Sequence, residues 1–165
     1  MKKIFLILSL FSLLTACEKD ADYWTNKRPD KLHKHNEKKV TITEGIWGTL
    51  IQMEGNLMPQ YNPKKSTKTF PIQREILFYE YTTKEGVNRK YDYIYEVYTK
   101  LIATTTSDKE GFFELKLVSG KYSVFVKEKN YLYPVRRDED GGISTITIPS
   151  SKVRDAFFVL DYLVY

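Results

Sequence analysis

The sequence has few residues of the kinds that carry nucleophilic catalysis or cross-linking. Its 165 residues include one cysteine, Cys17, and this excludes an internal disulfide. The two histidines, His33 and His35, both lie in a polar stretch near the N-terminus. The rest of the chain therefore lacks the base that Ser/His or Cys/His chemistry requires. We expect a protein that is not an enzyme and that holds no cofactor.

The sequence also lacks a long hydrophobic run and a strong excess of charge. A membrane-spanning helix needs ~20 apolar residues, and the apolar run at residues 4–14 is shorter than this. The formal net charge is +5, which falls to +3 without Lys2 and Lys3. A balance this mild, with no basic stripe, argues against a nucleic-acid partner.

The N-terminus has the features of a targeting segment. Lys2 and Lys3 precede the apolar run, as in a secretory signal peptide. The run ends at Leu14-Thr15-Ala16-Cys17, which resembles the bacterial lipobox. That resemblance implies a signal peptide over residues 1–16, cleavage before Cys17 and attachment of lipid such as palmitate to this cysteine. An ordinary secretory peptide, or a buried thiol at Cys17, is the alternative.

Lipid on Cys17 would place the protein in the cell envelope, anchored to a membrane without spanning it, because several acyl chains on one residue give stable anchoring. In a Gram-negative cell this means the outer membrane or the cell surface. Glu18-Lys19-Asp20 is similar to the export signal on surface lipoproteins of Bacteroidetes-like bacteria.

Residues 17–44 are predicted to be the lipidated cysteine and a flexible tether. The stretch is rich in charge and has little apolar periodicity, so it buries too little surface to offset the entropy of ordering it. A coil of about 25 residues would hold the domain on the order of 30 Å from the lipid. The His33–His35 spacing suits a metal on one extended face, but no third ligand stands beside it, and we expect a solvated linker without metal.

Residues 45–165 are predicted to form one β-sandwich domain. The clearest part is residues 104–129, which predict a β-hairpin that begins after a turn at Asp108 and Gly111 and reverses at Ser119 and Gly120. Apolar and polar residues alternate with period two in both arms. Five further strands are expected, at residues 45–51, 72–82, 93–105, 131–148 with a break, and 156–165. The last is apolar on both faces, which predicts a central strand or one covered by a partner.

These strands predict an all-β fold, a seven-stranded antiparallel Greek-key β-sandwich. Four sequence elements resemble the carboxypeptidase regulatory-like and transthyretin-like (prealbumin-like) family. They are Gly45-Ile46-Trp47-Gly48-Thr49-Leu50, Gly55-Asn56 with Met58-Pro59, Thr106-Ser107-Asp108 with Gly111-Phe112-Phe113, and Gly120-Lys121-Tyr122. The resemblance covers most of residues 45–126 and implies a non-catalytic module used in assembly, in carbohydrate or protein contact, or as a spacer. Tyr122 is expected to bury its ring and keep its hydroxyl hydrogen-bonded at a sheet corner.

The candidate contact residues are tyrosines. Tyr91, Tyr93 and Tyr95 are predicted to share one face of a strand, where exposed rings stack on sugars or form protein hot spots. The simpler interpretation is that they cover the half-buried outside of a sheet. Lys64, Lys65 and Lys68 form a basic loop that suits an anionic partner or plain solvation.

Asp138, Glu139 and Asp140 suit a solvated turn, with a calcium site as the alternative. Two functions therefore remain in view. The first is a lipid-anchored, non-catalytic envelope module that mediates structural or protein–protein interaction. The second is a carbohydrate-binding surface lipoprotein.

Overall fold

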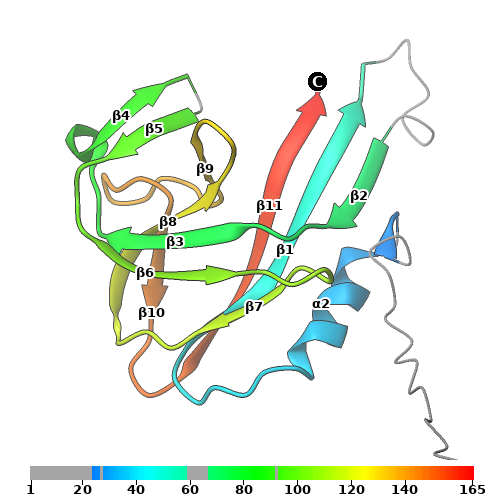
Figure 1. Cartoon of the computed structure of the whole chain (residues 1–165), viewed down its shortest axis with the longest axis horizontal. Helices are drawn as coiled ribbons and strands as arrows, with labels where there is room; N and C mark the ends of the chain where they lie inside the picture. Colours follow the sequence, from blue (N-terminus) through cyan, green and yellow to red (C-terminus); the bar gives the residue numbers. More distant parts are fainter. Residues whose placement is uncertain (1–23, 27, 59–66, 92) are drawn as a thin grey trace, which may run out of the picture.

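The structure is a computed structural model, and it describes residues 24–26, 28–58, 67–91 and 93–165. These residues form mainly β-strands in two sheets, with helix α2 (Pro29–Glu37) beside them (Figure 1). The expected all-β sandwich is confirmed. The number of strands was wrong, since the described part of the chain contains eleven rather than seven.

The first sheet is built around its longest strand, β1 (Gly45–Asn56). Strand β11 (Val153–Val164) pairs with the whole length of β1, and the two run parallel. The other side of β1 is shared by β7 (Phe112–Leu115) and β2 (Thr67–Pro71), both antiparallel to it. The predicted antiparallel pattern therefore holds except for β1 and β11.

The second sheet has seven strands, in the order β4-β5-β9-β8-β3-β6, and β10 also pairs with β8. Their bounds are β3 (Glu75–Glu80), β4 (Val87–Lys90), β5 (Tyr93–Val97), β6 (Leu101–Thr106), β8 (Gly120–Lys127), β9 (Leu132–Pro134) and β10 (Thr145–Ile148). A short 3-10 turn, η1 (Lys84–Gly86), joins β3 to β4.

The main hydrophobic core lies between the two sheets. Phe113 of β7 and Phe158 of β11 stack there with ring centroids 5.1 Å apart, against Phe78 of β3. Burying each such side chain contributes roughly 1.5–3 kcal/mol. On the far face of β8, Phe125 packs with Ile94 and forms a second, smaller core. Strand β8 is therefore buried on both faces.

The predicted hairpin at residues 104–129 was wrong in its pairing. Its two arms are β7 and β8, but β7 pairs with β1 in the first sheet whereas β8 pairs with β3, β9 and β10 in the second. The turn before Gly120 carries the chain from one sheet to the other. Tyr122 sits at this corner as expected, buried, with its hydroxyl donating to the carbonyl of Val118 at 3.0 Å.

Two other strand predictions also need correction. Residues 93–105 form two strands, β5 and β6, which lie at different places in the second sheet. The C-terminal strand β11 pairs only with β1 among the described residues, so it is an edge strand rather than a central one. Its two apolar faces are explained differently. Phe158 enters the main core, whereas Phe157 and Val159 lie on the outer face under Trp24 and Leu32.

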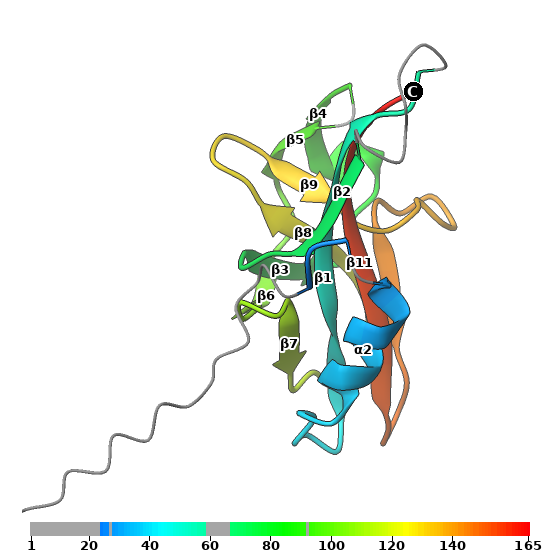
Figure 2. The same cartoon turned by 90° about the vertical axis from the view of Figure 1, so that its right-hand side faces the viewer.

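The flexible tether was wrong for the described residues before Gly45. Helix α2 begins with Pro29 at its first turn and has an acidic residue near its N-terminus and basic residues in its last turn, which suit the helix dipole. Figure 2 shows the helix lying along the outside of the first sheet. Leu32 and Asn36 are its buried residues. The folded unit therefore starts before the predicted boundary at residue 45.

In the part of the chain that the structure describes, no helix is long and apolar enough to cross a membrane. Cys17, Lys64 and Lys65 lie outside the described residues. Lys68 is described, and it is exposed on β2.

Candidate functional site

The segment from residue 91 to residue 102 exposes an unusual number of large apolar side chains. The exposed fractions are 82% for Tyr91, 49% for Tyr95, 61% for Tyr98, 43% for Leu101 and 39% for Ile102. Tyr91, Tyr95 and Tyr98 lie before, on and directly after β5, and we call these three residues the Tyr95 surface. Leu101 and Ile102 lie on β6, which is separated from β5 in the sheet by β9, β8 and β3. Exposed aromatic rings of this kind are typical of contact sites.

A β-bulge in the pairing of β4 with β5 lies at Tyr95. Asn88 of β4 pairs with Glu96, but the next residue, Arg89, pairs with Ile94, so Tyr95 has no residue opposite it. Ile94 enters the second core and Val97 packs against that core. Tyr95 and Glu96 between them are both exposed. Alternation after buried Ile94 already turns Tyr95 outward, and the bulge returns Val97 to the side of the core.

The three predicted contact tyrosines do not form one face. Tyr91 precedes β5 and has a positive φ of 56°, a turn conformation. Tyr93 is half-buried, with its ring 4.3 Å from the ring of Tyr131 between centroids. Only Tyr91 and Tyr95 of the three are exposed. Tyr98, which the sequence analysis did not select, is also exposed, and the sequence held no signal for it because the predicted strand ran on to residue 105.

Tyr93 belongs to a group of tyrosines that joins the two sheets. The hydroxyls of Tyr131 and Tyr162 are 3.0 Å apart, and Tyr133 meets Tyr162 edge to face at 5.4 Å. Burial, followed by the hydrogen bond with Tyr131, raises the pKa of Tyr162 far above its ordinary value. Replacing Tyr93 would therefore disturb packing as well as any contact with a ligand.

A second polar cluster lies where helix α2 meets the first sheet, and it contains both histidines. His33 Nε2 is 2.7 Å from Asp155 Oδ1, and His33 Nδ1 is 2.9 Å from Thr49 Oγ1. Asn36 Nδ2 donates to the same Thr49 oxygen at 3.0 Å. The prediction that His33 is a solvated linker residue was therefore wrong. The ring stacks on Trp47 at 4.7 Å, so it is part of the packed interface.

Asp155, His33 and Thr49 are hydrogen-bonded in the order found in a nucleophile triad. Here, however, these hydrogen bonds have a structural role. Since a carboxylate only accepts, Nε2 of a neutral His33 donates to Asp155, and Nδ1 then accepts from Thr49. Thr49 is completely buried in the sheet. Because its hydroxyl is closed off from solvent, no substrate can reach it as a nucleophile. The chain of hydrogen bonds instead fixes the helix on the sheet.

Glu110 holds the other half of this junction. Its carboxylate accepts from Trp24 Nε1 at 3.0 Å and lies 2.7 Å from Lys39 Nζ and 3.2 Å from His35 Nε2. Burial alone would raise the pKa of Glu110, but the hydrogen bonds from Lys39 and Trp24 outweigh it and hold the pKa below its usual range. Lys39 also pairs with Asp108 at 2.8 Å. Trp24, Lys39 and His35 are thereby tied to the loop before β7.

The acidic turn at residues 138–140 uses its carboxylates internally. Asp138 pairs with Arg89 at 3.0 Å and accepts from the backbone N–H of Ser144. Asp140 pairs with Lys121 at 2.6 Å. Among the described residues, no three His, Cys, Asp or Glu side chains are grouped closely enough to hold a metal ion. The calcium alternative thus gains no site from the arrangement of this turn.

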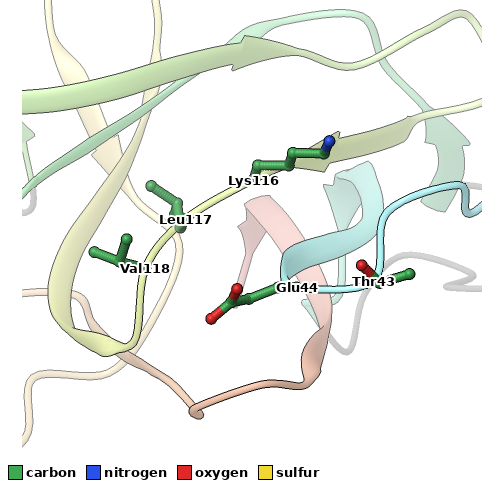
Figure 3. Close-up of a pocket in the computed structure, with 5 residues that line it drawn as sticks. All are labelled: Thr43, Glu44, Lys116, Leu117 and Val118. Atoms are coloured by element: carbon green, nitrogen blue, oxygen red, sulfur yellow. The ribbon is translucent and has the colours of Figure 1, made fainter.

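One open groove lies at the opposite end of β7 from the Trp24 junction. Figure 3 shows its lining, which consists of Thr43, Glu44, Lys116, Leu117 and Val118. Its volume is about 290 Å³. The side chains offer one carboxylate and one ammonium beside two aliphatic groups, and Val118 is 72% exposed. Such a lining has no arrangement that indicates a reaction.

No protein-family model matches the chain, and no curated protein or solved structure is significantly similar to it.

Proposed function

We propose that this chain is a lipid-anchored, non-catalytic β-sandwich module of the cell envelope that mediates structural or protein–protein interaction. The observation that carries the proposal is the Tyr95 surface, three exposed tyrosine rings on β5 and at its two ends. Apolar side chains exposed together on a folded domain are typical of a surface that a partner covers.

The start of the described chain and the Tyr95 surface lie at different ends of the domain. The anchor is lipid on Cys17, after cleavage at the lipobox-like Leu14-Thr15-Ala16-Cys17. The described chain begins at Trp24, on the side of the first sheet that carries α2. Both views show β4 and β5 at the end of the molecule away from this helix (Figures 1 and 2). A domain anchored through Cys17 therefore presents its β4–β5 end away from the lipid.

A photo-crosslinking amino acid at Tyr95 or Tyr98 tests the interaction in cells. We expect it to capture a defined envelope protein, because a covering partner brings its side chains within reach of these positions. The matched control is the same probe at Val118, which is more exposed than either tyrosine but lies on the groove. Equal capture from Val118, or no adduct from either tyrosine position, would count against the proposal.

The anchor has its own test. Labelling with a fatty-acid analogue should mark the wild-type chain and leave the Cys17→Ser variant unmarked, since Cys17 is the single cysteine. Labelling that is unchanged in the variant would exclude Cys17 as the lipid site. The outer membrane or cell surface of a Gram-negative cell is the proposed location, and fractionation with surface proteolysis separates the two.

A carbohydrate-binding lipoprotein is the second candidate, and the exposure of Tyr91 and Tyr95 favours keeping it. Aromatic rings stack on the apolar faces of sugars. Binding should be lost in Tyr95→Ala, while Tyr131→Phe, which keeps the ring of the tyrosine group, should retain it. Glycan retention that survives Tyr91→Ala and Tyr95→Ala together would remove this candidate.

We also propose that the sandwich is of the carboxypeptidase regulatory-like or transthyretin-like type. The Asp108–Gly111 turn and the Tyr122 corner support this assignment, as they carry the sequence resemblance. This assignment must also explain why β1 and β11 pair in parallel. An experimental structure compared strand by strand with members of that family would decide it.

A further inference from the structure

Residues 24–26 pack on the domain, although they lie shortly after Cys17 and inside the predicted flexible tether. Trp24 is 8% exposed and packs with Leu32 and Ile51. The backbone N–H of Asn26 donates to the carbonyl of Thr69 at 2.8 Å, and Asn26 Oδ1 accepts from the Thr69 N–H at 3.2 Å. These two bonds close the outer edge of β2, so residues 24–26 belong to the fold.

The packing of residues 24–26 on the domain limits how far Cys17 can lie from it. Trp24 is seven Cα–Cα steps from Cys17 along the chain. A fully extended chain of that length reaches at most about 25 Å. If Cys17 carries lipid, as proposed above, the side of the domain that bears Trp24 and α2 is held within that distance of the membrane.

The solvent face of α2 carries a row of lysines. Lys31, Lys34 and Lys38 are spaced by three and four residues, which places them on one side of a helix. All three are exposed, and the opposite side, with Leu32 and Asn36, is buried on the sheet. Of the acidic residues of this helix, Asp30 is paired with Arg28, and Glu37 borders the row.

We propose that this lysine row is the surface with which the domain rests on anionic lipid headgroups. The inference deepens the proposed function and rests on it. The connector between Cys17 and Trp24 contains Glu18, Asp20 and Asp22 against one lysine, so it contributes no attraction to such a surface. The lysine row of the helix is the basic surface nearest along the chain to Cys17, and each lysine near the membrane strengthens binding about fivefold.

The experiment attaches the chain to vesicles without depending on acylation in the cell. The chain from Cys17 to Tyr165 contains every described residue and a single thiol, which is coupled to a maleimide lipid. Coupled vesicles of phosphatidylcholine alone, or with phosphatidylglycerol, are treated with an amine-acetylating reagent. Mass spectrometry then gives the labelling rate of each lysine.

We expect phosphatidylglycerol to slow acetylation of Lys31, Lys34 and Lys38 severalfold and to leave Lys90 and Lys100, which are exposed on the second sheet side, unchanged. Raising the salt concentration should remove the difference, because the attraction is screened. Equal rates on both vesicles, or protection that is as large at Lys90 and Lys100, would overturn the inference.

A matched pair of variants gives a second measurement on the uncoupled Cys17→Ser chain. Replacing Lys34 by Gln should lower its partition onto phosphatidylglycerol vesicles about fivefold, whereas Lys100→Gln should not change it. Both residues are exposed, so neither substitution should disturb folding. Equal effects of the two substitutions would also overturn the inference. Failure of fatty-acid labelling at Cys17 in cells, with these lipid effects intact, would instead refute the proposed anchor.

Discussion

Replacing Leu32 by Ala is the sharpest test of whether helix α2 is part of the fold. Leu32 is 3% exposed and lies in a cluster with Trp24 and Ile51. Buried Leu→Ala substitutions cost about 2–5 kcal/mol, from lost transfer free energy and the cavity left behind. The surrounding side chains, Met53, Phe157 and Val159, are only partly buried, so we expect them to shift and fill part of the cavity left by Leu32. We therefore expect the lower part of that range, about 2–3 kcal/mol.

The loss should appear in urea unfolding followed by tryptophan fluorescence and in thermal unfolding. For a domain of this size, about 2–3 kcal/mol corresponds to a decrease in Tm of roughly 5–10 °C. Lys34→Ala is the control, because Lys34 lies on the exposed side of the same helix. Its effect should stay within about 0.5 kcal/mol.

Hydrogen exchange distinguishes local undocking of α2 from loss of global stability. If the helix opens as a separate unit, Leu32→Ala will speed amide exchange in residues 32–37 more than in β1 or β8. An effect of Leu32→Ala equal to that of Lys34→Ala in all three measurements would refute the reasoning. In that case residues 28–44 would behave as the tether that their composition predicts.

Three further predictions concern single interactions. Tyr133→Phe should destabilise the fold by about 1–2 kcal/mol, because the Tyr133 hydroxyl donates to the Asp161 carbonyl and accepts from the Asp161 N–H at the edge of β11. Hydrogen exchange of the Asp161 amide should become faster, and an unchanged exchange rate would contradict this role. Glu110→Gln should lower the free energy of unfolding at pH 7 by about 1–2 kcal/mol. Folding lowers the pKa of Glu110 below its ordinary 4.5, so the extra stability of the wild type is complete above about pH 5 and is lost as pH falls through the folded-state pKa. Urea titrations should therefore show a smaller difference in unfolding free energy between wild type and variant at pH 3 than at pH 7. A difference that stays constant would be inconsistent with this role. Gly111→Ala should cost several kcal/mol or prevent folding, because φ is +71° there and a Cβ would lie 2.2 Å from the Leu50 carbonyl oxygen; soluble expression and Tm report it, and a near-native Tm would show that this contact relaxes easily.

Local features of the fold were predicted well where a short range of residues determines them. The Asp108 carboxylate accepts from the backbone N–H groups of Glu110 and Phe112, and Gly111 has a positive φ, as the turn chemistry indicated. Tyr122 keeps its hydroxyl bonded at the corner. In these cases the side chain and its partner are within four residues of each other, so no distant contact had to be known.

Strand pairing was predicted poorly because alternation of apolar residues does not say which strand lies alongside. Phe113 and Val124 both face the main core, as their positions predicted, yet their strands belong to different sheets. A β-strand buries one face equally well in either sheet of a sandwich. The pairing of β7 with β1 rather than β8 is set by contacts more than fifty residues away in the sequence.

Part of the candidate site could be read from the sequence. Tyr91 and Tyr95 were selected as exposed aromatics and are exposed, but Tyr93 is held against Tyr131. The alternation of residues 93–95 indicates that Tyr95 faces away from Ile94, but it does not indicate the bulge, which depends on the register between β4 and β5. Tyr98 was missed for the same reason, as its exposure follows from where β5 ends.

The sequence by itself determined the local conformations, the alternation that makes a two-sheet β fold, and the lipobox-like segment that motivates the proposed anchor. Only the tertiary structure decided what residues 28–44 do. Their composition is that of a tether, because Leu32 is almost alone as an apolar residue in the helix. The helix is nevertheless held by bonds that single residues make to distant strands, such as His33 to Asp155 and Lys39 to Glu110. Such bonds have no periodicity along the chain, and they become visible only when β1, β11 and the loop before β7 are brought together.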